Sequence, residues 1–267
     1  MDDYATQLGL IEDDEIVLDE AALCLALLDH EGTQLPEYHR LLDAVATRLD
    51  LVGDDAHSAR QQAEALSQVL FDEFGFVGDQ ASYDDPANAD LIRVLDRRRG
   101  LPVSLSILYI AAARRMGWIA EALDVPGHVL VLIGNEAAPT IIDPFRGGCL
   151  VSEQQLAALV AAHTVGMPPA VRHVAAMANR AILVRLLLNQ ATRAKQAGKG
   201  RRALELYNRM TMIAPSHGPA WWERARLELD EGDTAAARHS LTAMLEVTRE
   251  PDLRSKITQT LDALIAI

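Results

Sequence analysis

The chain has 267 residues, 49% hydrophobic and 4% aromatic, and its 38 acidic and 25 basic side chains give a formal charge of −13. This composition is that of a folded acidic protein and excludes a fully disordered chain. The negative charge disfavours general binding to nucleic acid or anionic membranes, because both require a positive protein surface. The two cysteines, Cys24 and Cys149, are too few for a disulfide framework or a thiolate zinc cluster.

The charge is divided unevenly along the chain. Residues 1–90 carry a net charge of −19, whereas residues 91–267 carry +6. We therefore expect the acidic segment to fold onto the remainder and to meet some of its arginines, with solvated helix faces as the alternative. The acidic N-terminus does not resemble a signal peptide, and the apolar run at 103–113 is shorter than the roughly 20 residues that span a bilayer. These features predict a cytoplasmic location.

Apolar residues at helical spacing predict helices through the first 75 residues. A glycine- and aspartate-rich loop follows at 75–86, and a short helix is expected to run through Leu95. Residues 103–116 are apolar almost all round, which predicts a helix buried at the centre of the domain and ended by Gly117.

The pattern then changes to short β-branched segments. Residues 119–125, 128–133 and 140–145 are separated by turn residues, which predicts antiparallel strands. Ser152 and Gln155 form a capping box for one more helix. Residues 1–165 are thus expected to form one mostly helical α+β domain, in which a buried helix packs with a small antiparallel sheet.

Residues 171–267 are predicted to form a helical repeat region. A shift of 34 residues pairs small and large apolar residues with their equivalents: Leu187 with Trp221, Ala191 with Ala225, Gly198 with Gly232, Ala203 with Ala237, Tyr207 with Leu241, and Met210 with Met244. This period is typical of tetratricopeptide repeats. We expect two repeats, with residues 256–267 as a closing helix.

Three polar residues stand where a catalytic triad could form. Ser104 lies in the first turn of the buried helix, His128 opens one predicted strand, and Asp143 lies near the end of the next. A nucleophile, a base and an orienting acid in this order match a generalised triad. Each residue also has a structural interpretation: Ser104 as a helix cap, His128 as a hydrogen-bonded core histidine, and Asp143 as a turn residue.

Several sequence blocks resemble the bacterial transglutaminase-like family that carries C-terminal tetratricopeptide repeats. The blocks are LFDEFGF at 70–76, Tyr83, Asp85, Pro86, Asn88, VLDRRRGLPVSL at 94–105, PGH at 126–128 and DPFRGG at 143–148. The resemblance covers nearly the whole chain. It implies a papain- and transglutaminase-like core, in which catalytic members use a cysteine at the start of the buried helix with histidine and aspartate on successive strands.

By position, the resemblance places Ser104 at or near the nucleophile, His128 at the base and Asp143 at the orienting acid. Serine cannot be converted to its anion as a thiol can, so the missing cysteine indicates lost chemistry more often than a slow hydrolase. Cys149 is the rival nucleophile, although no helix end lies there to acidify it. Cys24, in an apolar helical stretch, is predicted to belong to the core.

Two functions follow. The favoured hypothesis is a protein- or peptide-binding module, and the alternative is a serine-dependent amidase, peptidase or transamidase, so whether the chain is an enzyme stays open. We expect no cofactor and no metal, because no phosphate-binding glycine loop or ligand-spaced histidine cluster is present. Arg97, Arg98 and Arg99 are expected to pair within the protein. The basic run at 193–202 is interpreted as a solvated loop or a partner contact.

Overall fold

The structure is a computed structural model that describes residues 2–135, 137–163 and 174–265. Contacts divide the chain into two compact units, one formed by Asp13–Leu183 and the other by Met1–Glu12 together with Val184–Ile267. The predicted boundary between residues 165 and 171 lies outside the described residues. Within the described ranges, no helix is both long and apolar enough to cross a membrane.

The unit formed by Asp13–Leu183 is mostly helical and contains both sheets. Its helices are η1 (Asp13–Glu15), α2 (Leu18–Leu27), α3 (Pro36–Gly53), α4 (Ala59–Ser67), the π-helical turn η2 (Gln68–Glu73), η3 (Pro86–Ala89), α5 (Leu91–Arg97), α6 (Pro102–Arg115), η4 (Pro144–Arg146) and α7 (Glu153–His163). Helix α8 (Asn179–Gln196) starts in this unit and continues into the other. The predicted α+β class is therefore confirmed.

The main sheet has five antiparallel strands in the order β6-β5-β4-β3-β7. Its strands are β3 (Ala120–Val125), β4 (His128–Ile133), β5 (Thr140–Asp143), β6 (Cys149–Leu150) and β7 (Ala175–Met177). The three predicted strands are β3, β4 and β5, but the last ends at Asp143 because Pro144 begins a 3-10 helix. The sequence pattern missed β6 and β7, which are too short to show an alternation of apolar and polar residues. It also missed a parallel pair, β1 (Val77–Gly78) and β2 (Arg99–Gly100).

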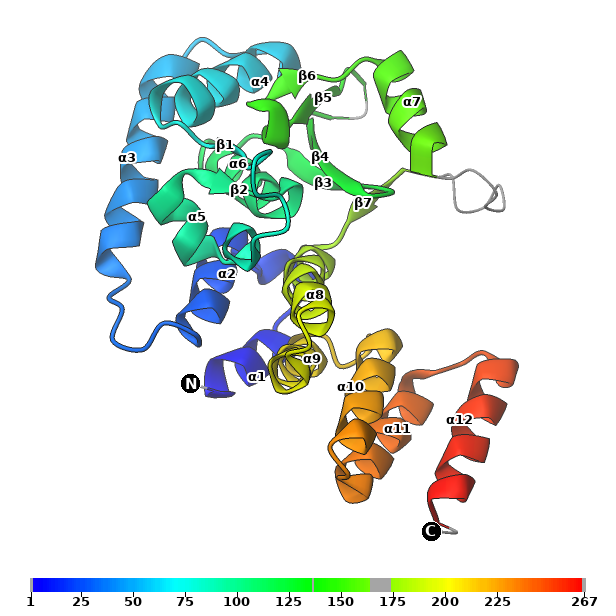
Figure 1. Ribbon diagram of the computed structural model, residues 1–267. Helices are drawn as coiled ribbons and strands as arrows, with labels where there is room; N and C mark the ends of the chain where they lie inside the picture. The colour runs from blue at the N-terminus through cyan, green and yellow to red at the C-terminus, as the bar shows by residue number, and fades with distance from the viewer. Residues whose placement is uncertain (1, 136, 164–173, 266–267) are drawn as a thin grey trace. The chain divides into compact units, whose positions relative to one another are not determined.

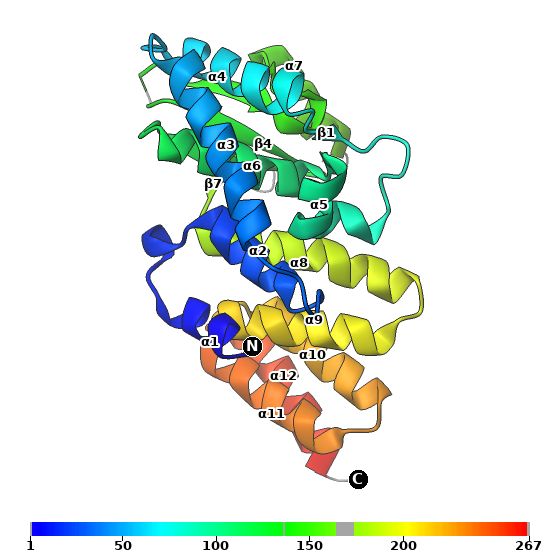
Figure 2. The ribbon, with the colours of Figure 1, turned by 90° about the vertical axis from the view of Figure 1, so that its left-hand side faces the viewer.

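The five-stranded sheet has a helix on each face. Alternate residues Leu130 and Leu132 of β4 pack with Leu156 and Leu159 of α7, whereas α6 packs on the opposite face (Figure 1). Residues 102–113 of α6 are all buried, as the apolar pattern predicted. Helix α3 lies along α6 on the side away from the sheet (Figure 2). Thus α6 is enclosed on several sides, and α7 covers the sheet face that remains.

The expected contacts between the acidic segment and the arginines are confirmed within this unit. Asp19 of α2 is fully buried and pairs with Arg115 at the end of α6, with 2.5 Å between the carboxylate and the guanidinium. Arg114 donates to Asn179 Oδ1 (2.8 Å), and the Asn179 N–H donates in turn to the Asp13 carboxylate (2.8 Å). Acidic residues of the N-terminal segment therefore pair with arginines of α6, directly or through Asn179.

The second unit is entirely helical among its described residues. It contains α1 (Asp2–Leu10), most of α8, α9 (Gly200–Ile213), α10 (Gly218–Asp230), α11 (Thr234–Val247) and α12 (Pro251–Ile265). Helix α1 packs on α9, where a Cβ added to Gly9 would lie only 2.1 Å from Met212 O. The closing helix predicted for residues 256–267 begins earlier, at Pro251, whose fixed φ suits a first helical turn.

Candidate functional site

His128 and Asp143 are joined by a hydrogen bond. His128 is the first residue of β4 and follows Gly127, whose φ of 78° makes the tight turn from β3. Its Nε2 lies 2.9 Å from Oδ1 of Asp143, the last residue of β5. Because an ionised carboxylate only accepts hydrogen bonds, the proton on Nε2 is assigned to the histidine. The structure thus brings together the predicted base and the predicted orienting acid.

Asp143 has further donors around its carboxylate. The same Oδ1 accepts from Phe145 N (3.0 Å), and Oδ2 lies 3.6 Å from Nε of Arg146. Asp143 is only 3% exposed, so these protein groups, rather than water, surround its carboxylate. Asp143 is therefore both the turn residue and the partner of the histidine.

Ser104, by contrast, is bonded to the main chain. It is the third residue of α6 and is fully buried, and its Oγ lies 2.8 Å from Asn88 O and 3.0 Å from Leu101 O, both of which accept from it. Among the residues that the structure describes, no hydrogen bond links Ser104 Oγ to the ring of His128. The structural interpretation of Ser104 thus describes its contacts, although it holds carbonyls rather than helix-start N–H groups.

His128 opens toward the α7 side of the sheet. Strand residues two apart share a face, so His128 shares the face of Leu130 and Leu132, on which α7 packs. His128 also lines a hollow with Leu159 of α7. Helix α6, which carries Ser104, packs on the other face, so the predicted nucleophile and base approach the sheet from different sides.

Cys149 lies near the His128–Asp143 pair, but its neighbour is Asp143 and not His128. It is exposed and is the direct register partner of Asp143 in the antiparallel pair β5–β6. Strand β5 lies between β6 and β4, so the carboxylate of Asp143 stands between the thiol and the imidazole. The fold thus places the orienting acid, and not the base, beside Cys149.

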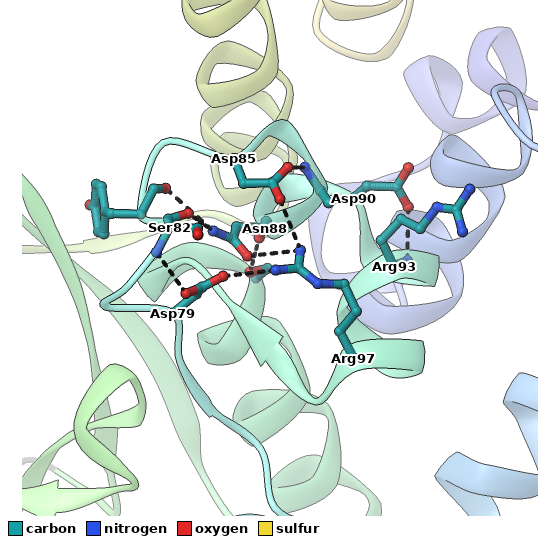
Figure 3. Close-up of polar contacts among 10 residues, drawn as sticks. Asp79, Ser82, Asp85, Asn88, Asp90, Arg93 and Arg97 are labelled. Atoms are coloured by element: carbon teal, nitrogen blue, oxygen red, sulfur yellow. Dashed lines mark hydrogen bonds and ion pairs between the residues drawn. The ribbon is translucent and has the colours of Figure 1, made fainter.

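A polar cluster fixes the loop between β1 and α5 (Figure 3). Through Asn88 O, this cluster also contacts Ser104 at the start of α6. Arg97 Nη2 donates to Asp79 Oδ2 (2.7 Å) and its Nη1 to Asn88 Oδ1 (3.2 Å), and Asn88 Nδ2 donates to Ser82 O (2.6 Å). Asn88 is fully buried and Asp79 is 3% exposed. The expectation that Arg97 pairs within the protein is confirmed, whereas the hub role of Asn88 was missed because its partners are set by the loop's tertiary path.

The pKa of Asp79 reflects this cluster. Burial by itself would raise the pKa, but hydrogen bonds from Ser82 and Asn88 and the charge of Arg97 outweigh burial and hold the pKa below its ordinary value. Asp79 therefore stays ionised and acts as a permanent anchor for the loop.

Tyr83 of this loop is the first of three rings in contact, which end at His128. The rings of Tyr83 and Phe145 meet edge to face with 5.7 Å between centroids, and those of Phe145 and His128 do so with 6.0 Å. A hollow of about 420 Å³ lies beside His128 and Phe145, and a second of about 290 Å³ lies beside Asp143 and Cys149. A larger hollow of about 690 Å³, near the start of α4, contains none of the predicted triad residues.

Tyr109 of α6 is a buried polar residue that the sequence analysis missed. It is fully buried, and its hydroxyl has no hydrogen-bond partner among the described residues. Burial, followed by the nearby Asp72, Cys149 and Asp143, raises its pKa far above the ordinary value. Its position within an apolar helical pattern made it indistinguishable from a core residue. In the described part of the chain, no group of three His, Cys, Asp or Glu side chains could hold a metal ion.

Comparisons with known proteins agree with this architecture. A family model described as the transglutaminase-like superfamily matches residues 36–188. A UPF0162 protein of Xylella fastidiosa (strain 9a5c) is 28% identical over 244 residues, which cover 90% of this chain and 87% of that protein. A UPF0162 protein of Vibrio cholerae serotype O1 is 30% identical over 151 residues, 56% of each chain.

Two more distant similarities are partial. Human F-box only protein 21 is 34% identical over 85 residues, which cover 32% of this chain and 14% of that protein. A crystal structure of menin aligns with 91% of this chain and 69% of its own at 12% identity, with a TM-score of 0.42. That score is too low to carry an argument about this chain.

Proposed function

Because the chain belongs to the transglutaminase-like superfamily, we propose that it is a protein- or peptide-binding module on a transglutaminase-like scaffold without a thiol at the start of its buried helix. One observation carries the proposal: the Ser104 hydroxyl is fully buried on two main-chain carbonyls, while His128, which pairs with Asp143, borders an open hollow. A serine nucleophile needs a base within hydrogen-bond reach, and this serine is bonded elsewhere. The exposed groups are suited to recognition.

We further propose that residues 171–267 include two tetratricopeptide repeats, and the C-terminal helices support this. Helices α9 and α11 begin at Gly200 and Thr234, 34 residues apart, and the preceding glycines, Gly198 and Gly232, are both left-handed with φ of 70° and 81°. The small residues of the repeat pattern, Ala191, Ala225, Ala203 and Ala237, are all buried. Repeats of this kind commonly bind peptides along one face of stacked helices.

The proposed partner is a protein or peptide rather than nucleic acid or a membrane, because the net charge is −13. A cytoplasmic location, with its reducing conditions, is part of the proposal and agrees with two free cysteines.

A synthetic peptide array probed with the purified full chain tests the proposal. We expect a set of peptides to bind, and His128→Ala to lower their binding, because His128 lines the hollow. His57→Ala is the matched control, since this exposed histidine precedes α4 and does not line this hollow. An array without a single reproducible binder would remove the basis for the proposal.

A serine-dependent acyl-transfer enzyme is the second candidate, and the 2.9 Å contact between His128 and Asp143 favours it, because an oriented imidazole is what a general base requires. Here Ser104 would leave its two carbonyls and attack an acyl group. A fluorophosphonate probe should then label the wild type and not Ser104→Ala. A folded wild type that the probe does not label would reject this candidate.

A further inference from the structure

The hollow of about 420 Å³ beside His128 combines donor groups with an apolar wall. It is lined by Gln80, Gly127, His128, Phe145, Arg146 and Leu159. These residues come from the β1–η3 loop, the β3–β4 turn, β4, η4 and α7, so the fold builds the hollow from segments that are distant along the chain. The ring of Phe145 is fixed by packing, since it lies against Gly78 and meets Tyr83 edge to face.

At this hollow, Arg146 and Gln80 have donors that no described residue uses, and Nδ1 of His128 is an acceptor that becomes a donor only when the imidazole is protonated. The Arg146 side chain is 67% exposed, and among the described residues its ion pair is with Asp143, through Nε. Nδ1 of His128 and the side-chain amide of exposed Gln80 form no hydrogen bond with any residue that the structure describes. A guanidinium, an imidazole and an amide therefore share one open space.

The carboxylate of Asp143 does not prevent an anion from binding in the hollow beside His128. It is 3% exposed, accepts hydrogen bonds from His128 Nε2 and Phe145 N, and forms an ion pair with Arg146 at 3.6 Å. The ionisable groups that line the hollow itself are only Arg146 and His128. The hollow thus offers one permanent positive charge, and a second when the imidazole is protonated, with an anionic carboxylate behind it.

From this balance of charge we infer that the hollow binds a carboxylate of the peptide ligand, an inference that rests on the proposed peptide-binding function. A carboxylate is planar and singly charged, so it matches the two-pronged guanidinium of Arg146, and its oxygens keep lone pairs that accept from Gln80 or from a protonated His128. A phosphate dianion would exceed the positive charge available. Phe145 and Leu159 receive the apolar side chain next to the carboxylate.

Calorimetric titration of the full chain with three small peptides tests the inference. Acetyl-Ala-Phe with a free terminal carboxylate, the same peptide as its amide, and acetyl-Asp-Phe-amide separate a terminal carboxylate, no carboxylate and a side-chain carboxylate. We expect at least one carboxylate peptide to bind about tenfold more tightly than acetyl-Ala-Phe-amide, because charge-assisted hydrogen bonds are lost with the amide. The carboxylate peptide that binds more tightly shows whether the hollow prefers a terminal or a side-chain carboxylate.

Arg146→Gln is the decisive variant, since Arg146 is mostly exposed and we expect the fold to tolerate the change. We expect it to abolish the preference for the carboxylate peptide over the amide. Arg40→Gln removes an arginine that is 73% exposed on α3 and serves as the matched control, with the preference retained. Equal affinity for all three peptides, no binding of any at millimolar concentration, or a preference that survives Arg146→Gln overturns the inference.

The two proposals fail separately. If array peptides bind through His128 but bind equally as acids and amides, peptide binding stands and the carboxylate inference is lost. If the array has no binder at all, the proposed function itself is lost.

Discussion

Two polar clusters in Asp13–Leu183 differ in how they meet water. The cluster around Asn88 includes Asp79, Arg97 and Ser104, and three of these four residues are at most 3% exposed and bonded within the protein. The cluster around His128 keeps unused donors on an open hollow. Buried and satisfied polar groups define a fold, whereas exposed and unsatisfied ones are available to a ligand. Ser104 belongs to the first kind, although the motif groups it with the second.

The largest effect should come from the centre of the buried cluster. Asn88→Ala removes the donor to Ser82 O and the acceptor of Arg97, both inside the protein. We expect a loss of about 3 kcal/mol in the free energy of unfolding, because buried polar groups are left without partners. Urea unfolding followed by circular dichroism measures it. Asn135→Ala, at an exposed turn, is the control, and equal effects of the two changes would contradict the structural role of Asn88.

A smaller effect should connect the two clusters. An added Cβ at Gly78 would lie 2.4 Å from Cδ2 of Phe145, so Gly78→Ala must displace this ring from the wall of the hollow. We expect about 2 kcal/mol of destabilisation from overpacking, together with weaker peptide binding. Gly200→Ala meets nothing within 4 Å at the start of α9, so it should not destabilise the fold and should leave peptide affinity unchanged. Unchanged peptide affinity in Gly78→Ala would show that Phe145 does not shape the binding site.

Two serines of α6 test the interpretation of Ser104 directly. Ser104→Ala should lose about 1 kcal/mol of stability with its two carbonyl contacts and keep peptide affinity. Ser106→Ala is matched, because its buried Oγ has no partner among the described residues, and should be neutral or stabilising. Thermal unfolding of both variants separates them. Equal shifts would mean that the contacts of Ser104 contribute nothing.

The smallest effect concerns Tyr109, whose hydroxyl is buried without a described partner. Tyr109→Phe should change stability by less than about 0.5 kcal/mol at pH 8. Burial raises the folded pKa above the unfolded value of about 10, so the native state keeps its proton, and stability is complete below pH 10 and declines as the pH rises further. The variant should decline less when urea unfolding is repeated at about pH 10.5. Parallel declines would contradict the burial of the hydroxyl.

Local patterns predicted most of the helices and the central strands. The capping box of Ser152 and Gln155 forms as expected, with Ser152 N donating to Gln155 Oε1 (2.8 Å), and Gly117 ends α6 with φ of 72°. Both depend on residues three to five positions apart. The short strands β1, β2, β6 and β7 could not be found in this way, because their existence depends on a partner strand elsewhere in the chain.

The predicted site divides along the same line. His128 and Asp143 were correctly paired, because adjacent antiparallel strands bring nearby chain positions together. The partner of Ser104, Asn88, lies sixteen residues earlier, and the position of Cys149 opposite Asp143 follows from strand order. The hollow that carries the binding proposals draws together Gln80 and Leu159, which are 79 residues apart in the chain (159 − 80), and no spacing rule reveals this.

The sequence by itself determined the α+β class, the buried helix, the strand that carries His128 and the acidic segment that pairs with the arginines. These features follow from hydrophobic periodicity, turn residues and charge, which act over short distances or over the whole composition. Only the tertiary structure decided which polar groups are enclosed and which face a ligand. That choice depends on which face of the sheet each helix covers, and burial exists only once distant segments have packed together.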